Sequence, residues 1–391
     1  MTLKIAFATP YYHPLDVLRG SGTSYHLVRE LEAQDCLVSC FGPLNFQEPW
    51  QVRGLRAWSK RVQRKPFKTY LDPLVVRPLG QALDAQLAGV EADLLMTNDP
   101  AAAAGTRSRL PLVYYSDVML PPGRDPTIWA GNFAFGSLPL WALRRCQRTM
   151  ESCLKRADLL IFPADWQAET AQRWGVDPAK IHVISYGANI VDPGPAALQE
   201  RLERLQTARP ELRLLFIGTD WVLKDGPTAL ETARLLKESG LKIRMDVVGV
   251  KLDGLPEYVR CWGRLNKSNP EDYLKLDQLF RQSDFLILPT RYEGLGIAPR
   301  EAAAYGLPTL ASRIAGVVNS VVDGGSGRLI APEEGAAGFA NAAKALWESE
   351  GSYQALCESA RHVFEARYNW SGCVASLVEV LKQFLEERGS A

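Results

Sequence analysis

Short apolar runs alternate with helix-length segments along almost the whole chain, and this alternation limits the folds available to it. Within each run the apolar residues are nearly continuous, which is typical of strands buried on both faces of a parallel sheet. The intervening segment 226–240 has Pro227 at its start and Gly240 at its end, as expected of a helix. The sequence therefore predicts an α/β protein with parallel sheets. The runs are 3–9, 36–42, 92–98, 111–117, 157–164, 180–187, 212–218, 242–249, 259–263, 284–290 and 307–312.

The runs form two series, separated by a stretch at 187–211 that begins with glycine and proline residues. A chain of 391 residues exceeds the usual size of a single hydrophobic core. We therefore expect two domains, residues 1–190 and residues 191–368. The last segment, 369–391, carries apolar side chains at helical spacing and predicts an amphipathic helix that covers an apolar surface.

The composition excludes several classes of protein. Lys and Arg number 45 and Asp and Glu 44, so the overall charge does not favour a nucleic-acid partner. The 7 cysteines are scattered and form no C-x-x-C pair, which favours reduced thiols in a cytosol over a disulfide framework or a zinc site. Pro10 interrupts the first apolar run too early for a signal peptide, and no run approaches the roughly 20 residues of a membrane span. We expect a cytoplasmic protein.

Two segments that follow predicted strands carry residues suited to anion binding. Gly20, Ser21 and Gly22 precede a helix, so backbone N–H groups and the positive helix end can approach a phosphate. The alternative is a flexible loop that only caps the helix. Lys224 stands just before a helix N-terminus, where it would repel the helix dipole unless an anion lies between them. The alternative is a solvated surface lysine.

A third segment places two carboxylates, Glu293 and Glu301, around Gly294 and Gly296. The glycines allow the backbone to approach a ligand closely, and Pro299 suits the first turn of a helix. A carboxylate can accept two hydrogen bonds from a vicinal diol such as that of a ribose. The two acids can therefore bind different hydroxyl-rich parts of one ligand. The alternatives are a helix-start carboxylate for Glu293 and a solvated helix face for Glu301.

The pattern E-G-x-G-x-x-x-x-E-A-x-x-x-G-x-P is present as EGLGIAPREAAAYGLP at 293–308. It resembles the pattern of the family-four retaining glycosyltransferases with the GT-B fold. The resemblance extends in order over most of the chain, through the glycine-rich loop, Lys-Asp-Gly at 224–226, and the segments 157–190 and 321–330.

The resemblance implies two Rossmann-like domains whose parallel sheets face each other across an inter-domain cleft. Residues 1–190 would form the acceptor domain, residues 191–368 the nucleotide-sugar donor domain, and the helix at 369–391 would cross back to the N-terminal domain. The only small molecules implied are a UDP- or GDP-linked sugar and a hydroxyl acceptor, with no further cofactor.

Roles follow from the resemblance residue by residue. Glu293 would contact donor-sugar hydroxyls, Glu301 would hold the ribose, and Lys224 would neutralise the diphosphate. Backbone N–H groups of 294–297 and of 20–22 would approach the phosphates. The implied catalytic residues are Glu293, Lys224 and Asp117. The implied donor-binding residues are Gly20, Ser21, Gly22, Thr219, Lys224, Arg291, Glu293, Gly294, Leu295, Gly296, Ile297 and Glu301.

The sequence departs from the family's pattern at three places. Thr219 stands where many members have an arginine, so Arg291 or the Thr219 hydroxyl would compensate for the missing cation. The segment with Ser116 and Asp117 stands where many members have a histidine. Asn319 stands where the family has an acid.

The expected chemistry is metal-independent, because the sequence contains neither a D-x-D motif nor a cluster of Asp and His. Glycosyl transfer passes through an oxocarbenium-like state, and the leaving diphosphate can be stabilised electrostatically by Lys224 and backbone N–H groups. A diphosphate oxygen can take the acceptor proton in a retaining enzyme of this type, so no strong protein base is required.

The acceptor is not specified by these motifs, but the segment 52–71 gives a hypothesis. It contains no acid, and its basic residues are interleaved with aromatic ones, which would suit peripheral contact with an anionic membrane at its inner face and a lipid-linked acceptor. The alternative is a solvated segment that faces a soluble acceptor or nothing. The basic and aromatic residues are Arg53, Arg56, Trp58, Lys60, Arg61, Arg64, Lys65, Phe67, Lys68 and Tyr70.

Two further functions remain open from the sequence. One is a nucleotide-sugar epimerase on the same scaffold, although such enzymes use an acid and histidine set, and only His13 and His26 lie near a plausible cleft. The other is a non-catalytic sugar-nucleotide-binding protein, which the missing arginine and histidine keep under consideration.

Overall fold

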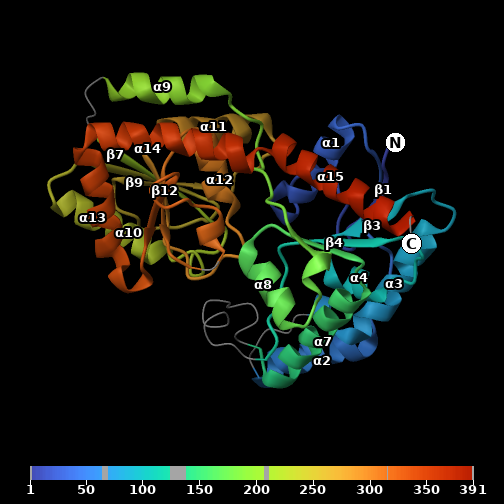
Figure 1. Ribbon diagram of the computed structural model, residues 1–391. Helices are drawn as coiled ribbons and strands as arrows, with labels where there is room; N and C mark the ends of the chain where they lie inside the picture. The colour runs from blue at the N-terminus through green and yellow to red at the C-terminus, as the bar shows by residue number, and fades with distance from the viewer. Residues whose placement is uncertain (1, 64–68, 124–137, 207–210, 315, 390–391) are drawn as a thin grey trace. The chain divides into compact units, whose positions relative to one another are not determined.

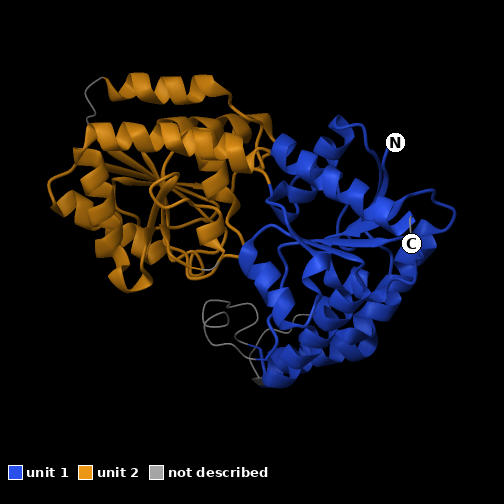
Figure 2. Cartoon of the chain, in the orientation of Figure 1, with its two compact units in different colours: residues 1–186, 370–391 blue, residues 187–369 orange. Residues whose placement is uncertain are grey.

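The computed structural model divides the chain into two compact units, which are coloured separately in Figure 2. Unit 1 comprises Met1–Tyr186 and Trp370–Ala391, and unit 2 comprises Gly187–Asn369. The chain passes between the units a few residues from the predicted boundaries at 190 and 369. The residues that the structure describes are 2–63, 69–123, 138–206, 211–314 and 316–389.

Unit 1 is built on a 6-stranded parallel sheet with the strand order β2-β1-β3-β4-β5-β6. The strand order reverses direction between β1 and β3, because β2 lies on one side of β1 and the later strands on the other. In an open α/β sheet, ligands bind beyond the carboxyl ends of the strands at such a point. The strands are β1 (Lys4–Ala8), β2 (Leu37–Phe41), β3 (Leu94–Thr97), β4 (Leu112–Tyr115), β5 (Leu159–Phe162) and β6 (Ile181–Val183).

Helices cover this sheet (Figure 1), and the last helix of the chain belongs to the same unit. It packs against α1 and buries the apolar positions Val374, Leu377, Val378 and Leu381 that the sequence pattern had indicated. The helices of unit 1 are α1 (Thr23–Ala33), α2 (Trp50–Trp58), α3 (Pro73–Leu87), α4 (Pro100–Gly105), α7 (Leu140–Arg156), α8 (Asp165–Arg173) and α15 (Trp370–Gly389).

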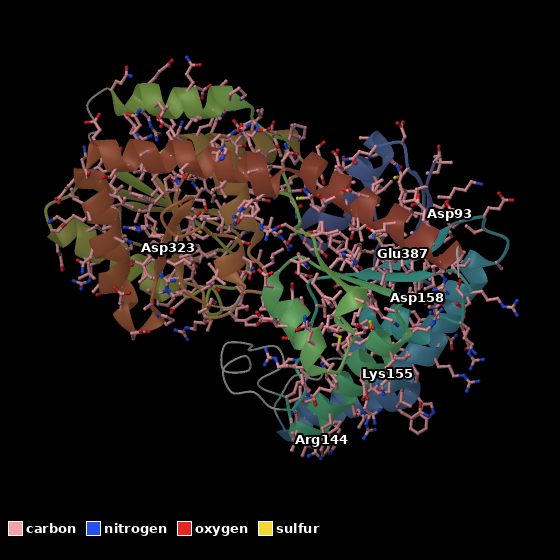
Figure 3. The ribbon with its side chains drawn as sticks, viewed as in Figure 1. Asp93, Arg144, Lys155, Asp158, Asp323 and Glu387 are labelled. Atoms are coloured by element: carbon pink, nitrogen blue, oxygen red, sulfur yellow. The ribbon has the colours of Figure 1, made fainter. Side chains whose placement is uncertain are left out.

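Polar contacts fix both ends of α15 on unit 1. Near its start, the Gln34 side chain donates to the Ser371 carbonyl at 2.8 Å. Near its end, Arg388 donates to one oxygen of the Asp158 carboxylate at 2.9 Å. Asp158, labelled in Figure 3, also accepts the Leu112 N–H at 2.8 Å and so links the helix to the start of β4. The predicted amphipathic helix therefore packs its apolar side against unit 1.

Unit 2 repeats the design with a second 6-stranded parallel sheet, in the order β12-β11-β10-β7-β8-β9. Here the order reverses between β7 and β10. The last strand, β12, was not among the predicted apolar runs, because it is short and only its two end residues are buried. The strands are β7 (Leu212–Ile217), β8 (Ile243–Val248), β9 (Val259–Gly263), β10 (Phe285–Leu288), β11 (Thr309–Ser312) and β12 (Gly327–Ile330).

The helices of unit 2 include the one predicted at 226–240, which the structure places at Gly226–Glu238. Pro227 lies in its first turn, as the sequence indicated. The helices are α9 (Pro195–Leu205), α10 (Gly226–Glu238), α11 (Pro270–Gln282), α12 (Ile297–Ala304), α13 (Gly335–Glu348) and α14 (Glu350–Val363).

The nearly continuous apolar runs are confirmed as strands, and five of these strands are buried on both faces. Every residue of β3, β4, β5, β10 and β11 is buried. By contrast, the edge strand β2 has no fully buried residue. This is the pattern expected when helices cover both faces of a parallel sheet and leave only its edges exposed.

Candidate functional site

The loops that follow β7 and β10 carry the predicted phosphate and sugar residues. These strands are neighbours, and the order of the sheet reverses between them, so both loops emerge at the same carboxyl edge. The loops also contact each other, since the Arg291 N–H donates to the Leu223 carbonyl at 3.0 Å. The sheet topology therefore brings Lys224 and Glu293 to one place, although they are far apart in sequence.

Lys224 and Glu293 form an ion pair in which the ammonium group donates to Glu293 Oε2. Their side chains are 17% and 19% exposed, so neither is a freely solvated charge. Gly218 makes room for the lysine, because a Cβ at that position would lie 2.8 Å from Lys224 Cγ. The alternative of a solvated surface lysine is therefore wrong, and the predicted phosphate-binding cation is held against the predicted sugar-binding acid.

The backbone around Glu293 depends on glycine. Gly296 has a φ of +86°, a left-handed conformation that favours glycine, and it forms the N-cap of α12 without any side-chain cap hydrogen bond. The N-cap residue is thus Gly296, and Glu293 lies in the loop before it. A Cβ on Gly316 would lie 2.0 Å from the Glu293 carbonyl oxygen, so this glycine allows a further loop to pack against the acid's backbone.

Glu301 lies in α12 and is buried, with only 3% of its surface exposed. Its carboxylate accepts a hydrogen bond from Lys267, which lies in the loop between β9 and α11. The lysine also donates to the Asn189 carbonyl at 3.0 Å. The alternative of a solvated helix face is wrong, and the close packing that its small neighbours indicated is confirmed. Lys267 itself was missed, because a lysine in a polar loop has no distinguishing spacing.

A buried arginine supports the loop between Gly294 and Gly296 through hydrogen bonds. Arg300 is fully buried and donates to Ser320 Oγ at 2.8 Å and to the Asn319 carbonyl at 3.1 Å. Ser320 Oγ in turn donates to the Leu295 carbonyl at 2.5 Å. Asn319, which stands where the family has an acid, thus serves this network through its backbone. Sequence reasoning missed the network, since an arginine beside Glu301 reads as a surface charge.

The two residues expected to replace the missing cation are both exposed. Arg291 donates to the Asp225 carboxylate at 3.1 Å, and this hydrogen bond raises the pKa of the guanidinium. Thr219 follows directly on Gly218, beside which Lys224 lies. Both residues belong to the loops after β7 and β10. Their roles toward a phosphate stay predictions.

In unit 1 the glycine-rich segment forms a short 3₁₀ turn that leads into α1. Gly20, Ser21 and Gly22 have φ values of 55°, 58° and 84°, so even the serine adopts a left-handed conformation. The N–H groups of this turn lie at the start of α1, where the helix dipole favours an anion. The geometry is compatible with the predicted contact to phosphates, which stays a prediction.

Beside this turn lies a polar cluster that sequence reasoning did not single out. Asn98 follows β3, and its amide donates to Tyr12 Oη at 3.2 Å and to Ser24 Oγ at 3.1 Å. Ser116 Oγ, which follows β4, donates to the Asn98 carbonyl at 2.7 Å. The cluster stands at the point where the strand order of unit 1 reverses. Uncharged donors and acceptors of this kind can hold hydroxyl groups.

Asp117 is exposed at the end of β4, and its carbonyl accepts from the Gln167 side chain at 2.8 Å. It belongs to unit 1, whereas Glu293, Lys224 and Glu301 belong to unit 2. The structure thus joins Lys224 to Glu293, and Glu301 to Lys267, within one unit. The assembly of residues from both units into a single site stays a prediction.

The described part of the chain contains neither a metal-binding cluster nor a membrane-spanning helix. No group of three or more His, Cys, Asp and Glu side chains within it is placed to hold a metal ion. Among its helices, none is both long and apolar enough to cross a lipid bilayer.

Comparison with known proteins identifies both halves of the chain. Residues 22–191 match the family model described as Glycosyltransferase Family 4, and residues 194–349 match the one described as Glycosyl transferases group 1. The chain therefore carries the two domains of a family-four glycosyltransferase, and the predicted family is confirmed. Neither the epimerase nor the non-catalytic alternative is favoured by these matches.

A curated protein similar to this chain belongs to the same class. A D-inositol 3-phosphate glycosyltransferase 2 from Catenulispora acidiphila is 28% identical over 247 residues, which are 59% of this chain and 57% of that protein. The match thus spans less than two thirds of this relative's length.

Solved structures resemble the chain over nearly its whole length. Sucrose-phosphate synthase from Thermosynechococcus elongatus aligns with a TM-score of 0.67 and 16% identity, covering 98% of this chain and 100% of the other. HepE from Anabaena in complex with UDP-glucose aligns with a TM-score of 0.64 and 17% identity, covering 97% and 100%. At these identities the likeness establishes the fold, and the predicted GT-B class of two Rossmann-like units with parallel sheets is confirmed.

Proposed function

We propose that this protein is a retaining glycosyltransferase that moves a sugar from a UDP- or GDP-linked donor to a hydroxyl acceptor. The observation that carries the proposal is the Lys224–Glu293 pair at the carboxyl edge of β7 and β10, in a chain with two glycosyltransferase domains. A cation and an acid at this edge, beside the glycine-containing loop 294–297, suit a ligand with a diphosphate and sugar hydroxyls.

The proposed roles are electrostatic. Lys224 and the N–H groups of 294–297 stabilise the negative charge that develops on the leaving diphosphate, and a diphosphate oxygen receives the acceptor proton. Glu293 binds hydroxyls of the sugar, and Glu301 binds the ribose. The UDP-glucose complex of the structural neighbour HepE supports a nucleoside-diphosphate sugar as the donor, with UDP as the first nucleotide to test.

A thermal-shift panel of UDP-, GDP- and ADP-sugars tests the donor class, because a ligand that binds the native state raises the melting temperature. We expect one nucleotide to stabilise the protein and its sugar to be hydrolysed or transferred. Binding without turnover on any acceptor would favour the non-catalytic alternative. Failure of all three donors to shift the melting temperature would contradict the proposal.

We further propose that unit 1 contacts an anionic membrane surface, which would suit a lipid-linked acceptor. The support is a face made of α2, the following turn Ser59–Gln63 and the start of α7, which we call the basic face. Residues 64–68, which include Arg64, Lys65, Phe67 and Lys68 of the predicted segment, lie outside the described residues. The described exposed side chains of the face are Trp50, Arg53, Arg56, Trp58, Lys60, Arg61, Val62, Leu140 and Arg144.

The chemistry of the basic face combines cations with exposed apolar groups. Trp50 is 72% exposed and Val62 65%, which is unusual for large apolar side chains. The ring of Trp58 lies 5.9 Å from that of Trp141, so the end of α2 and the start of α7 form one surface. Arg144, labelled in Figure 3, is an exposed cation of α7 three residues after Trp141. Cations with aromatic side chains favour the interface of an anionic bilayer.

We expect the protein to float with anionic liposomes at low salt and to be released at high salt. Replacing Lys60 and Arg61 together with glutamine should weaken binding by roughly 30-fold, at about 1 kcal/mol for each cation near the surface. The matched control neutralises Lys155 and Lys180, which lie elsewhere on unit 1, and should bind like the unmodified protein. No flotation with anionic liposomes at moderate salt would refute the membrane contact.

A further inference from the structure

The loop that carries Lys267 is held in a fixed shape between β9 and α11. The Asn266 N–H donates to the Asp272 carboxylate at 2.9 Å, and the Asn266 side chain accepts the Ser268 N–H at 2.8 Å. Asn269 caps α11 by accepting the Glu271 N–H at 2.9 Å. Hydrogen bonds thus secure the backbone on both sides of Lys267, so the position of its ammonium group is defined by the fold.

The ammonium group of Lys267 connects two buried acceptors. It donates to Glu301 Oε1, on a side chain that is 4% exposed, and to the carbonyl of Asn189, which is 1% exposed. A buried carboxylate is costly unless it is paired and hydrogen-bonded. Lys267 therefore offsets the charge of Glu301, and its second bond prevents the ammonium from following the carboxylate if that group rotates.

The two oxygens of Glu301 have different environments. Oε1 accepts from Lys267, whereas Oε2 accepts no hydrogen bond from the described residues. The lysine thus fixes one oxygen and leaves the other available to a ligand. A ribose hydroxyl is a donor that could use it.

We infer that Lys267 is a positioning residue for the donor nucleotide, which orients the Glu301 carboxylate so that Oε2 receives a ribose hydroxyl. The inference rests on the proposed function, because it takes Glu301 as the ribose-binding acid. Lys267 acts through Glu301, and its loss leaves the carboxylate buried without its cation and free to rotate. A variant without the Lys267 ammonium group should lose both affinity for nucleotides and the ability to recognise the ribose hydroxyl.

The test compares UDP with 2′-deoxy-UDP by calorimetry, and GDP and ADP are measured in the same way. The unmodified protein should prefer UDP by at least about tenfold, the value of one hydrogen bond to a charged group. Lys267→Met should weaken UDP binding roughly tenfold and bring the ratio of the two affinities close to one. Lys267→Arg, which keeps a cation, should retain part of the UDP affinity and part of the preference for UDP over 2′-deoxy-UDP. A merely structural role would leave the ratio unchanged.

A double-mutant cycle with Glu301→Gln tests whether the lysine acts through the acid. Lys267→Met should change UDP affinity little when residue 301 is already glutamine. Lys275→Met is the matched control, because Lys275 contacts Gln278 and does not touch Glu301. Lys267→Gln is a second uncharged variant if the methionine protein lacks a normal melting transition.

The outcomes separate this inference from the proposed function. If UDP binds and the Lys267 variants keep the preference for the 2′-hydroxyl, the positioning role is wrong while the function stands. An equal effect of Lys267→Met on both Glu301 backgrounds also overturns it. If none of the three nucleoside diphosphates binds the unmodified protein, the proposed function fails first.

Discussion

Lys224→Ala lowers the turnover of the protein by roughly 10²–10³-fold, the range found when one group that stabilises developing charge is removed. The physical reason is that the leaving diphosphate gains negative charge in the transition state, and Lys224 is the cation held at the carboxyl edge of β7. Steady-state kinetics with the donor that gives the largest thermal shift provide the measurement. Because the interaction strengthens in the transition state, the loss should appear in kcat and not only in KM.

The ion pair with Glu293 requires a second variant, because removing the lysine also leaves an unpaired carboxylate beside the diphosphate. Lys224→Ala should therefore be measured in a Glu293→Gln background as well. A loss that persists there shows that the lysine acts on the donor, whereas a loss that vanishes shows that it only neutralises the acid. Lys237→Ala, on an exposed position of α10, is the control and should leave turnover unchanged. Turnover of Lys224→Ala within about threefold of the unmodified protein would refute the proposed role.

Arg201→Leu destabilises unit 2 by about 3–5 kcal/mol, the range observed when a buried cation or its partners lose their bonds. Arg201 is 1% exposed, and it reaches from α9 to the ends of two other helices. It donates to the Phe280 carbonyl at 2.7 Å, to the Ser283 carbonyl at 2.5 Å and to the Tyr305 carbonyl at 3.1 Å.

These acceptors lie at the C-termini of α11 and α12, where carbonyls lack helical partners and the helix dipole favours a cation. Leucine would leave buried carbonyls unpaired, each at about 1–3 kcal/mol. Urea denaturation, followed by hydrogen exchange in α11 and α12, would measure the loss in unit 2 separately from unit 1. Arg234→Leu, an exposed arginine of α10 that pairs with Glu231 and Glu238, is the matched control and should change the transition little. Equal effects of the two substitutions would contradict the anchoring role.

The anchoring by Arg201 also bears on the site, because α12 carries Glu301. A loosened C-terminus of α12 would let that carboxylate move away from Lys267. The loop before the helix has its own support from Arg300 and Ser320. Two buried arginines therefore stabilise the two ends of α12. Neither was among the residues predicted to bind the ligand.

Much of the fold could be predicted because a buried strand can be recognised from a few consecutive residues. An apolar run of the β10 type, followed by a glycine-containing loop and a helix with Pro299 in its first turn, needs no distant information. Strand β12 was missed because it is only Gly327–Ile330 long and its two middle residues are not buried. The buried arginines were missed because a charged residue signals solvent unless its partners are known.

By itself, the sequence determined the two series of parallel strands and the glycines and acids placed after them, because apolar continuity and turn residues act over a few neighbours. Only the tertiary structure decided which charges meet. Glu293 pairs with a lysine 69 residues away and Glu301 with one 34 residues away. The first pair exists because β7 and β10 are neighbours at the point where the strand order reverses, and the second joins the loop after β9 to the helix α12. Strand order depends on the packing of the whole unit, and no local pattern records it.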